Sequence, residues 1–137
     1  MKAAQILTID GEFAMKRGSL TTPSIAFETW GKLNSQADNA VLIFTGLSPS
    51  AHAASSSEDP SAGWWEDMIG PAKPLDSDRY FIICVNSLGS CFGSTGPASV
   101  NPTNGAPYRL SFPVLTVEDI ANTAAHILDN LDLDQLH

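Results

Sequence analysis

The sequence has little positive charge, only two cysteines and no long uninterrupted apolar run. Seven Lys and Arg residues stand against fifteen Asp and Glu residues in 137 positions, which gives a formal net charge of −8. Phosphate binding draws on clustered Lys and Arg, so this composition argues against a nucleic-acid partner. The apolar segments are also too interrupted to cross a bilayer. We therefore expect neither nucleic acid nor a membrane among the partners.

The cysteines and the N-terminus indicate a cytoplasmic protein. Cys84 and Cys91 lack the C-x-x-C spacing of redox or metal motifs, and we expect both thiols to be reduced. The N-terminal sequence M-K-A-A-Q-I-L-T-I-D-G-E lacks the apolar segment of a secretory signal. The three histidines, His52, His126 and His137, are scattered, so no metal site is predicted.

Two apolar segments dominate the pattern, residues 39–47 (N-A-V-L-I-F-T-G-L) and residues 79–86 (R-Y-F-I-I-C-V-N). Strands this apolar are normally covered on both faces, which favours a parallel or mixed sheet with helices on both sides. With 137 residues, 43% of them hydrophobic, the chain has the size and composition of about one domain, residues 1–137. Ligands of such sheets bind beyond the carboxyl ends of the strands, so the loops after both segments are the candidate site.

The remaining segments predict antiparallel strands at one sheet edge and helices around the sheet. Residues 12–20 and 23–30 are interpreted as a hairpin with Gly18 in its turn. Residues 63–70 (G-W-W-E-D-M-I-G) are interpreted as a short helix, and Thr116 as the N-cap of a longer amphipathic helix. The predicted fold class is α/β, with a mixed, mostly parallel sheet.

The turn after the first apolar segment nearly matches the nucleophile-elbow pattern G-x-S-x-G, from Gly46 to Ser50. The second Gly of the pattern is missing, and Pro49 lacks the backbone N–H that an oxyanion hole would need, so Ser48 is a poor candidate nucleophile. A second interpretation uses no side chain, because the backbone N–H of Leu47 would donate to an oxyanion. A third is a plain turn without chemistry. From the residues alone, the second and third interpretations stay open.

The second apolar segment leads into a glycine-rich run, residues 88–97 (L-G-S-C-F-G-S-T-G-P). The run has neither the G-x-G-x-x-G spacing nor the G-K-[ST] ending of phosphate-binding loops, and its prolines prevent a helix from following directly. We expect instead a tightly folded loop, rich in Ser and Thr, that lines a pocket.

The chain closely resembles the homoserine O-acetyltransferase family and its succinyl-transferring relatives in residues 64–102, W-W-E-D-M-I-G-P-A-K-P-L-D-S-D-R-Y-F-I-I-C-V-N-S-L-G-S-C-F-G-S-T-G-P-A-S-V-N-P. The flanking segments F-E-T-W-G-K-L-N and P-Y-R-L-S-F-P-V-L-T-V-E-D agree, so the resemblance extends from Met15 to the end. The variant T-G-L-S-P, followed by S-A-H-A-A, looks like the serine O-succinyltransferases. The resemblance implies an α/β-hydrolase fold with an inserted helical lid.

For activity, the resemblance implies acyl transfer from succinyl-CoA or acetyl-CoA to the hydroxyl of L-serine or L-homoserine, through a serine acyl-enzyme. The product would be an activated ester in cysteine or methionine biosynthesis. Gly46, Leu47, Ser48 and Pro49 would form the substrate-specificity stretch, with the Leu47 amide as oxyanion donor. Acyl-CoA is a co-substrate, so no cofactor is expected, and the whole enzyme is expected to be a homodimer.

The resemblance also implies what this chain lacks. In the family the nucleophilic Ser follows the strand after the last predicted helix, and the Asp and His come later, whereas this chain stops at His137. We expect an inactive N-terminal fragment that ends before the nucleophile elbow, in which no Ser or His replaces the missing residues. The strand of residues 40–45 would keep an uncovered apolar edge, which favours association. The alternative is a non-catalytic fragment that binds at most a partner.

Overall fold

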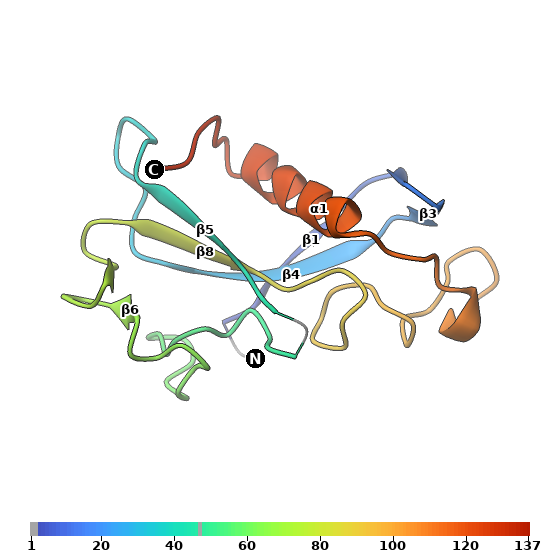
Figure 1. Cartoon of the computed structure of the whole chain (residues 1–137), viewed down its shortest axis with the longest axis horizontal. Coiled ribbons are helices and arrows are strands. Elements are labelled where there is room, and N and C mark those ends of the chain that lie inside the picture. Colours follow the sequence, from blue (N-terminus) through green and yellow to red (C-terminus); the bar gives the residue numbers. More distant parts are fainter. Residues whose placement is uncertain (1–2, 47) are drawn as a thin grey trace.

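A mixed four-stranded sheet forms the centre of the molecule (Figure 1). The computed structural model describes residues 3–46 and 48–137. The strands lie side by side in the order β1, β4, β8, β5. Their bounds are Gln5–Thr8 for β1, Ser24–Trp30 for β4, Phe81–Val85 for β8 and Ala40–Phe44 for β5.

The two apolar segments of the sequence are neighbouring parallel strands. β5 pairs with β8 from Ala40 opposite Phe81 to Phe44 opposite Val85. β4 runs antiparallel to β8, and β1 runs antiparallel to β4. The prediction of a mixed sheet is confirmed, and within this sheet the parallel pairing is confined to β5 and β8. Their parallel register brings both carboxyl ends to the same edge of the sheet.

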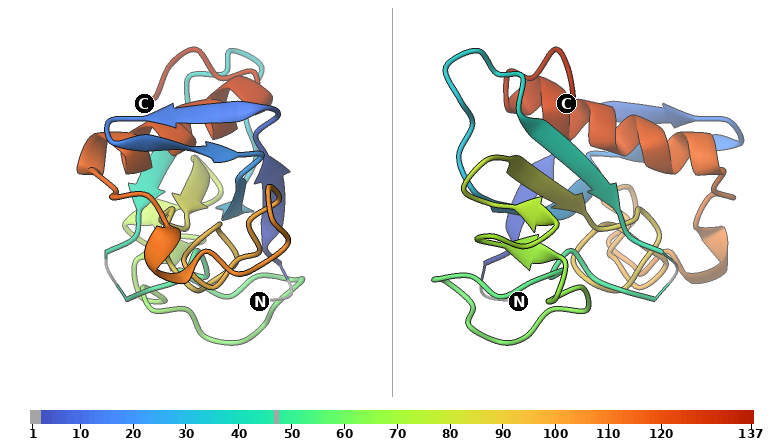
Figure 2. Two further views of the ribbon diagram at one scale, coloured as in Figure 1. Left: turned by 90° about the vertical axis from the view of Figure 1, so that its right-hand side faces the viewer. Right: turned by 60° about the vertical axis from the view of Figure 1, so that its left-hand side comes forward.

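One face of the sheet is covered by helix α1 (Val117–Asn130) and by the hairpin of β2 (Glu12–Met15) and β3 (Gly18–Thr21), as Figure 2 shows. Apolar side chains of the helix, the hairpin and the sheet form a single cluster, which removes them from water. Buried members of this cluster include Phe13, Leu20, Ile25, Phe27, Ile83, Val85, Ala124 and Ile127.

The opposite face is covered by irregular chain between β5 and β8. Two short strands in it, β6 (Ile69–Gly70) and β7 (Leu75–Asp76), pair with each other in parallel. The sequence pattern predicted helices on both faces, but in the described part of the chain only one face carries a helix. The buried residues of this second cluster are Trp30, Ile43, Ala53, Ala54, Ile69, Ile82 and Cys84.

The predicted short helix at residues 63–70 is wrong. Residues 64–68 form turns that lead into β6. The backbone N–H of Trp65 donates to the carbonyl of Ala53 (2.7 Å), and that of Trp64 donates to the carbonyl of His52 (3.4 Å). The backbone N–H of Met68 donates to the carbonyl of Trp65 three residues before it (2.9 Å), which is the bond of a turn, so turns attached to the preceding loop replace the predicted helix.

The predicted first hairpin is also wrong in its pairing. Residues 12–21 form a hairpin by themselves, with Lys16 and Arg17 in the turn and Gly18 at the start of β3. β4 instead pairs with β1, a strand that the sequence did not predict. β1 is an edge strand with mostly exposed side chains, so it lacks the apolar alternation that marks a half-buried strand.

Thr116 is the N-cap of helix α1, as predicted. The Thr116 hydroxyl accepts a hydrogen bond from the backbone N–H of Asp119, and the Asp119 carboxylate accepts one from the backbone N–H of Thr116. This reciprocal pair is a capping box. The same carboxylate also accepts from the backbone N–H of Lys16 (2.9 Å), so the start of the helix is fixed to the hairpin turn.

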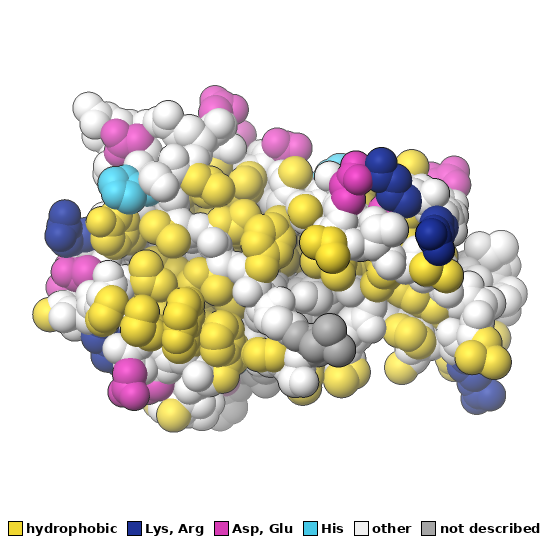
Figure 3. Space-filling view, in the orientation of Figure 1, with side chains coloured by type: hydrophobic (Ala, Val, Ile, Leu, Met, Phe, Trp, Pro, Cys, Tyr) yellow, Lys and Arg dark blue, Asp and Glu magenta, His cyan; other side chains and the backbone are white. Residues whose placement is uncertain are grey.

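The outer edge of β5 is largely unpaired within the described residues, as predicted. β5 pairs with β8 on one side, and on the other side the backbone N–H of His137 donates to the carbonyl of Ala40 (2.8 Å). Figure 3 shows hydrophobic side chains gathered over β5, β8 and the β6 segment. Phe44 is 46% exposed at the end of β5. An apolar edge of this kind is a template for pairing with another chain.

We therefore expect the 137-residue chain to self-associate at micromolar concentrations. Phe44→Lys should weaken association at least about tenfold, because burying a Phe side chain contributes roughly 1.5–3 kcal/mol and a charged edge resists pairing. Sedimentation velocity over a concentration series measures the change. Val100→Lys, at a side chain that is 60% exposed three residues after the glycine-rich run, is the matched control. Equal association of both variants and the parent would contradict the role of the β5 edge.

Candidate functional site

Two hydroxyl groups lie side by side where β5 and β8 end. Thr45 follows β5, and Ser87 follows β8 by two residues. Thr45 Oγ1 and Ser87 Oγ are 3.2 Å apart, within hydrogen-bonding distance. The two loops that the sequence marked as the candidate site therefore start next to each other.

A pocket of about 640 Å³ opens between these strand ends and the first turns of α1. Its volume is in the range of small-molecule sites. The glycine-rich run contributes Leu88, Gly89 and Ser90 to the wall, which confirms that this run lines a pocket. The other lining residues are Phe44, Thr45, Gly46, Ser87, Leu115, Val117, Ile120 and Ala121.

The predicted substrate-specificity stretch borders this pocket. Gly46 lines it, Ser48 is exposed, and Pro49 is half-buried. Leu47 lies outside the described residues, so its role as backbone oxyanion donor stays a prediction. His52, five residues further on, has both ring nitrogens bound to other groups. It therefore cannot act as the base that a nucleophilic Ser48 would require.

Ser50 fixes the chain directly after this stretch. The indole Nε1–H of Trp64 donates to the Ser50 carbonyl (2.8 Å), and the backbone N–H of His52 donates to Ser50 Oγ (3.2 Å). The Trp64 ring stacks on the Trp65 ring, with centroids 5.5 Å apart. The stretch is thus tied to the fold at Thr45 on one side and at Ser50 on the other.

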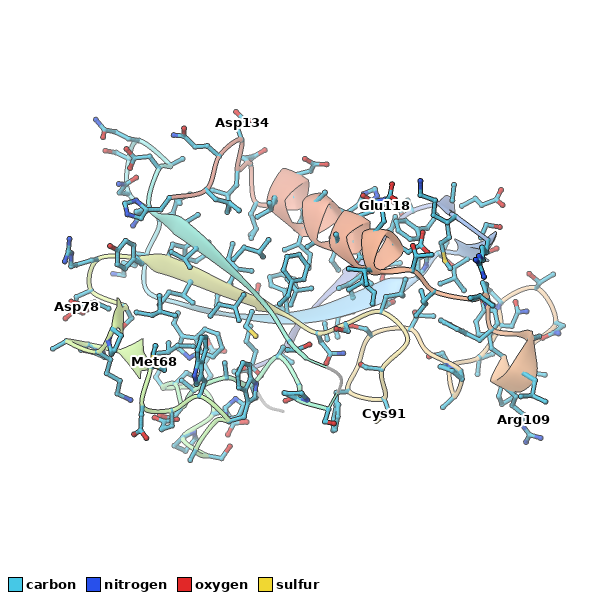
Figure 4. All side chains as sticks on the ribbon, in the orientation of Figure 1. Met68, Asp78, Cys91, Arg109, Glu118 and Asp134 are labelled. Atoms are coloured by element: carbon cyan, nitrogen blue, oxygen red, sulfur yellow. The ribbon has the colours of Figure 1, made fainter. Side chains whose placement is uncertain are left out.

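Asn86, at the end of β8, organises the glycine-rich loop. Its side-chain amide donates to the hydroxyls of Ser90 (2.6 Å) and Ser94 (3.0 Å), and Ser94 donates to the Asn86 carbonyl (2.7 Å). Gly89 has φ +86°, and a Cβ there would lie 2.2 Å from Leu115 Cδ1. The left-handed backbone at residue 89 favours Gly, and a side chain there would also displace the Leu115 side chain from its contact with the loop. Figure 4 labels Cys91 in this loop and Glu118 at the start of α1.

A buried charged cluster lies on the sheet face opposite α1. Glu28 of β4 is 1% exposed, and its Oε2 atom lies 2.9 Å from His52 Nδ1. The Nε2 atom of His52 lies 2.9 Å from the Ser61 carbonyl oxygen. Burial alone would lower the pKa of His52, but the hydrogen bonds to Glu28 and Ser61 and the charges of Glu28 and Asp59 raise it above the ordinary value.

The sequence does not connect positions 28 and 52, and it indicates no role for His52. One signal was present, because Glu28 stands inside the otherwise uncharged strand S-I-A-F-E-T-W. A carboxylate in a buried strand requires a partner. The partner itself depends on how the long loop after β5 folds back over the sheet, which the residue pattern does not specify.

Glu66 joins two parts of the long loop after β5. Its carboxylate accepts hydrogen bonds from the backbone N–H groups of Gly63 (3.0 Å) and Ser55 (2.7 Å) and from the Ser55 hydroxyl (2.7 Å). These bonds, with help from the Lys73 ammonium 3.5 Å away, lower the pKa of Glu66 to about 2. The loop that carries His52 is therefore closed by a carboxylate that stays ionised at neutral pH.

No metal site is present in residues 3–46 and 48–137, where no three His, Cys, Asp or Glu side chains are grouped to hold an ion. Among the described helices, none is long and apolar enough to span a bilayer. Cys84 is buried, and this burial, together with the charge of Glu28, raises the pKa of its thiol to about 12. A neutral buried thiol is unreactive, so Cys84 is a packing residue.

Acyltransferases are among the proteins most similar in sequence. The chain is 59% identical over 136 residues to a serine O-succinyltransferase of Litchfieldella anticariensis, a match that covers 98% of this chain and 37% of that protein. It is 57% identical over 135 residues to an L-serine/homoserine O-acetyltransferase of Streptomyces lavendulae, covering 98% of this chain and 36% of that protein. The chain thus spans slightly more than a third of these relatives' length. No protein-family model matches the chain.

Solved structures of an acyltransferase and an esterase superpose closely on this chain. A homoserine O-acetyltransferase from Bacillus anthracis superposes with a TM-score of 0.86 at 31% identity, covering 100% of this chain and 39% of that chain. Esterase E22 superposes with a TM-score of 0.87 at 33% identity, covering 97% of this chain and 38% of that chain. The predicted α/β-hydrolase fold class is confirmed. The chain belongs to the homoserine/serine O-acyltransferase family of the α/β-hydrolase superfamily.

Proposed function

We propose that this chain supplies the oxyanion loop and one wall of the acyl site in a CoA-dependent O-acyltransferase. The observation that carries the proposal is the 59% identity to a serine O-succinyltransferase over 98% of the chain. The pocket beyond the carboxyl ends of β5 and β8 supports it, since ligands of such sheets bind there. Succinyl-CoA is the favoured donor over acetyl-CoA, and L-serine the favoured acceptor over L-homoserine.

The proposed reaction has two steps and a serine that this chain does not contain. The Ser oxygen attacks the thioester carbonyl of the acyl-CoA, the C–S bond breaks, and CoA leaves as a thiol with the proton of the Ser hydroxyl. The hydroxyl of the amino acid then attacks the enzyme ester, the bond to the Ser oxygen breaks, and the proton of the attacking hydroxyl passes to that Ser oxygen. In each step the Leu47 N–H would stabilise the negative charge on the acyl oxygen.

The described residues have supporting roles in this proposal. Thr45 and Ser50 hold the two ends of the specificity stretch, and the apolar side of the pocket would limit water near the acyl-enzyme. The ester product would serve as an activated intermediate in cysteine or methionine biosynthesis. The family resemblance supports a cytoplasmic homodimer for the whole enzyme, with acyl-CoA as a co-substrate and no cofactor.

A hydrolase is the second candidate, because esterase E22 shares the fold of this chain with a TM-score of 0.87. In that case water would replace the amino acid in the second step. The relatives at 57–59% identity favour transfer over hydrolysis, since their names specify serine or homoserine. A non-catalytic binding module is the third candidate.

A segment exchange separates these candidates. In the Litchfieldella enzyme, the 136 matched residues are replaced by this chain, and CoA release is followed with a thiol reagent. We expect CoA release from succinyl-CoA that requires L-serine, at a rate within about tenfold of the parent enzyme, equivalent to about 1.4 kcal/mol or less in the barrier. The 137-residue chain alone should release no CoA above a blank.

Each other outcome favours a different candidate. CoA release without any amino acid, or rapid cleavage of p-nitrophenyl esters, would favour a hydrolase. A folded but inactive chimera would favour the binding module. CoA release by the 137-residue chain itself would contradict the proposal that the nucleophile lies outside it.

A further inference from the structure

Glu28, His52 and Ser61 have the outline of a Ser-His-acid triad. Glu28 Oε2 lies 2.9 Å from His52 Nδ1, and Ser61 Oγ lies 3.2 Å from His52 Nε2. In a working triad, Nε2 carries no proton, so that it can accept the proton of the Ser hydroxyl. The other contacts of these residues exclude that state.

Both ring nitrogens of His52 face atoms that only accept hydrogen bonds. Nδ1 faces the Glu28 carboxylate, and Nε2 faces the Ser61 carbonyl oxygen, each 2.9 Å away. An imidazole that donates from both nitrogens has two N–H groups and a positive charge. The Ser61 hydroxyl donates its proton to Asp59 Oδ1 (2.6 Å), so it does not donate that proton to His52 Nε2. The arrangement is a hydrogen-bonded ion pair of Glu28 and His52, with the Ser61 carbonyl as second acceptor, and we call it the clamp. It is not a nucleophile with its base.

The charged groups that face the His52 ring favour its protonation. Glu28 approaches from β4 and Asp59 from the loop, and both are acidic. Cys84 on β8 faces Glu28 but stays a neutral thiol, because burial raises its pKa to about 12. Glu28 Oε1 is buried without a hydrogen-bond partner in the described residues, so His52 is the group that compensates the buried carboxylate.

We propose that His52 is a positioning residue that holds the Gly46–Pro49 stretch in place for acyl transfer, by clamping the segment after it to β4. This inference rests on the proposed function of the stretch. The connection is short, because Ser50 follows Pro49 directly and accepts a hydrogen bond from the His52 backbone N–H. The His52 carbonyl accepts from the Trp64 N–H, and the Trp64 indole holds the Ser50 carbonyl. A displaced His52 therefore displaces Ser50, the residue that directly follows the stretch.

The clamp has a defined pH dependence. The pKa of His52 is higher in the folded chain than its ordinary value of 6.5. The stabilisation is therefore complete below a pH of about 6.5 and is lost as the pH rises through the pKa of the folded state. Stability and positioning are expected to weaken together on the alkaline side.

The protonation state is measured by ¹⁵N NMR on the 137-residue chain labelled at its three histidines. The His52 signals are assigned by their absence in His52→Gln. We expect most His52 rings to carry two protons at pH 6.5, where an ordinary imidazole is half neutral, and proton binding that Glu28→Gln weakens at least about tenfold, because the negative partner is gone. A bare ring nitrogen on most His52 rings at pH 6.5 would overturn the clamp.

The positioning role is measured in the chimeric enzyme. His52→Gln should lower kcat about 100-fold, as expected for a misplaced catalytic loop, with the KM for succinyl-CoA changed by less than about threefold. His126→Gln, an exposed histidine on α1, is the matched control and should change neither constant. An unchanged kcat in the His52 variant would overturn the positioning role.

A variant that does not fold and a chimera without activity lead to different conclusions. If the His52→Gln chimera fails to fold, the pH profile of the unmodified chimera decides, since kcat should fall as the pH rises through the His52 titration seen by NMR. A flat profile there would overturn the proposal. A chimera without any activity would count against the proposed function, whereas the NMR measurement still decides the protonated clamp.

Discussion

Gly31→Ala is expected to lower the free energy of unfolding by about 4 kcal/mol, the largest single effect that we predict for this chain. Gly31 directly follows β4 with φ +77°, and a Cβ there would lie 2.1 Å from the Tyr80 carbonyl oxygen and 2.5 Å from the Ser77 carbonyl oxygen. Backbone atoms cannot move aside as a flexible side chain can, so β4 would separate from the segment that leads into β8. Urea unfolding followed by Trp fluorescence measures the loss.

Gly11→Ala is the matched control for the backbone conformation. Gly11 has φ +80°, but nothing lies within 4 Å of a Cβ built there. Gly11→Ala should lower the free energy of unfolding only by the strain of the left-handed conformation, about 1–2 kcal/mol. The difference between the two variants therefore isolates the clash at Gly31. Equal losses for both would show that the close approach to Tyr80 and Ser77 is relieved at little cost.

Asp119→Ala is expected to lower the free energy of unfolding by about 3 kcal/mol. Asp119 is 1% exposed, and its carboxylate accepts hydrogen bonds from the backbone N–H groups of Lys16 (2.9 Å) and Thr116 (2.8 Å) and from the Thr116 hydroxyl (2.8 Å). Removal of the carboxylate leaves these donors without a partner, at roughly 1–3 kcal/mol for each one that stays buried. Thermal and urea unfolding measure the change.

The control for Asp119 is its neighbour Glu118. Its side chain pairs with the Lys16 ammonium at 3.1 Å, but 59% and 56% of the two side chains are exposed. Glu118→Ala should therefore cost no more than about 1 kcal/mol. A loss as large as that of Asp119→Ala would contradict the assignment of the stability to the buried carboxylate.

The pH dependence of Asp119 runs opposite to that of His52. Burial alone would raise the pKa of Asp119, but the hydrogen bonds from Lys16 and Thr116 and the Lys16 charge lower it below the ordinary value of 3.8. The contribution of Asp119 is therefore present above a pH of about 3.8 and is lost as the pH falls through the pKa of the folded state. Asp119→Ala should remove part of the acid sensitivity of unfolding.

The elements with strong local signals were predictable from the sequence. The continuous apolar runs marked the strands β5 and β8, of which β8 is mostly buried and β5 is buried only at Ala40 and Ile43. Thr116 with its acidic first turn marked the N-cap of α1. The location of the pocket followed from these strands, because their carboxyl ends must meet. The proposed specificity role of the Gly46–Pro49 stretch comes from the family resemblance, and no periodicity marks it.

The elements that depend on long-range contacts were not predictable. The pairing of β1 with β4 joins residues about twenty positions apart, and neither the pattern of β1 nor its exposure indicates it. At residues 64–65 the backbone donors bind the loop at residues 52–53, so tertiary contacts prevail over a local helical pattern. The Glu28 and His52 pair depends on the same loop, which explains why it too was missed.

The most direct test of the proposed acyl site is a crystal structure of the chimeric enzyme trapped as its acyl-enzyme. Our account predicts that a backbone N–H of the Gly46–Pro49 stretch, that of Leu47, lies within about 3.1 Å of the acyl carbonyl oxygen. The acyl chain should occupy the pocket beside Phe44 and Leu88. An acyl oxygen held by other donors, with the N–H groups of this stretch turned away from the pocket, would contradict the account.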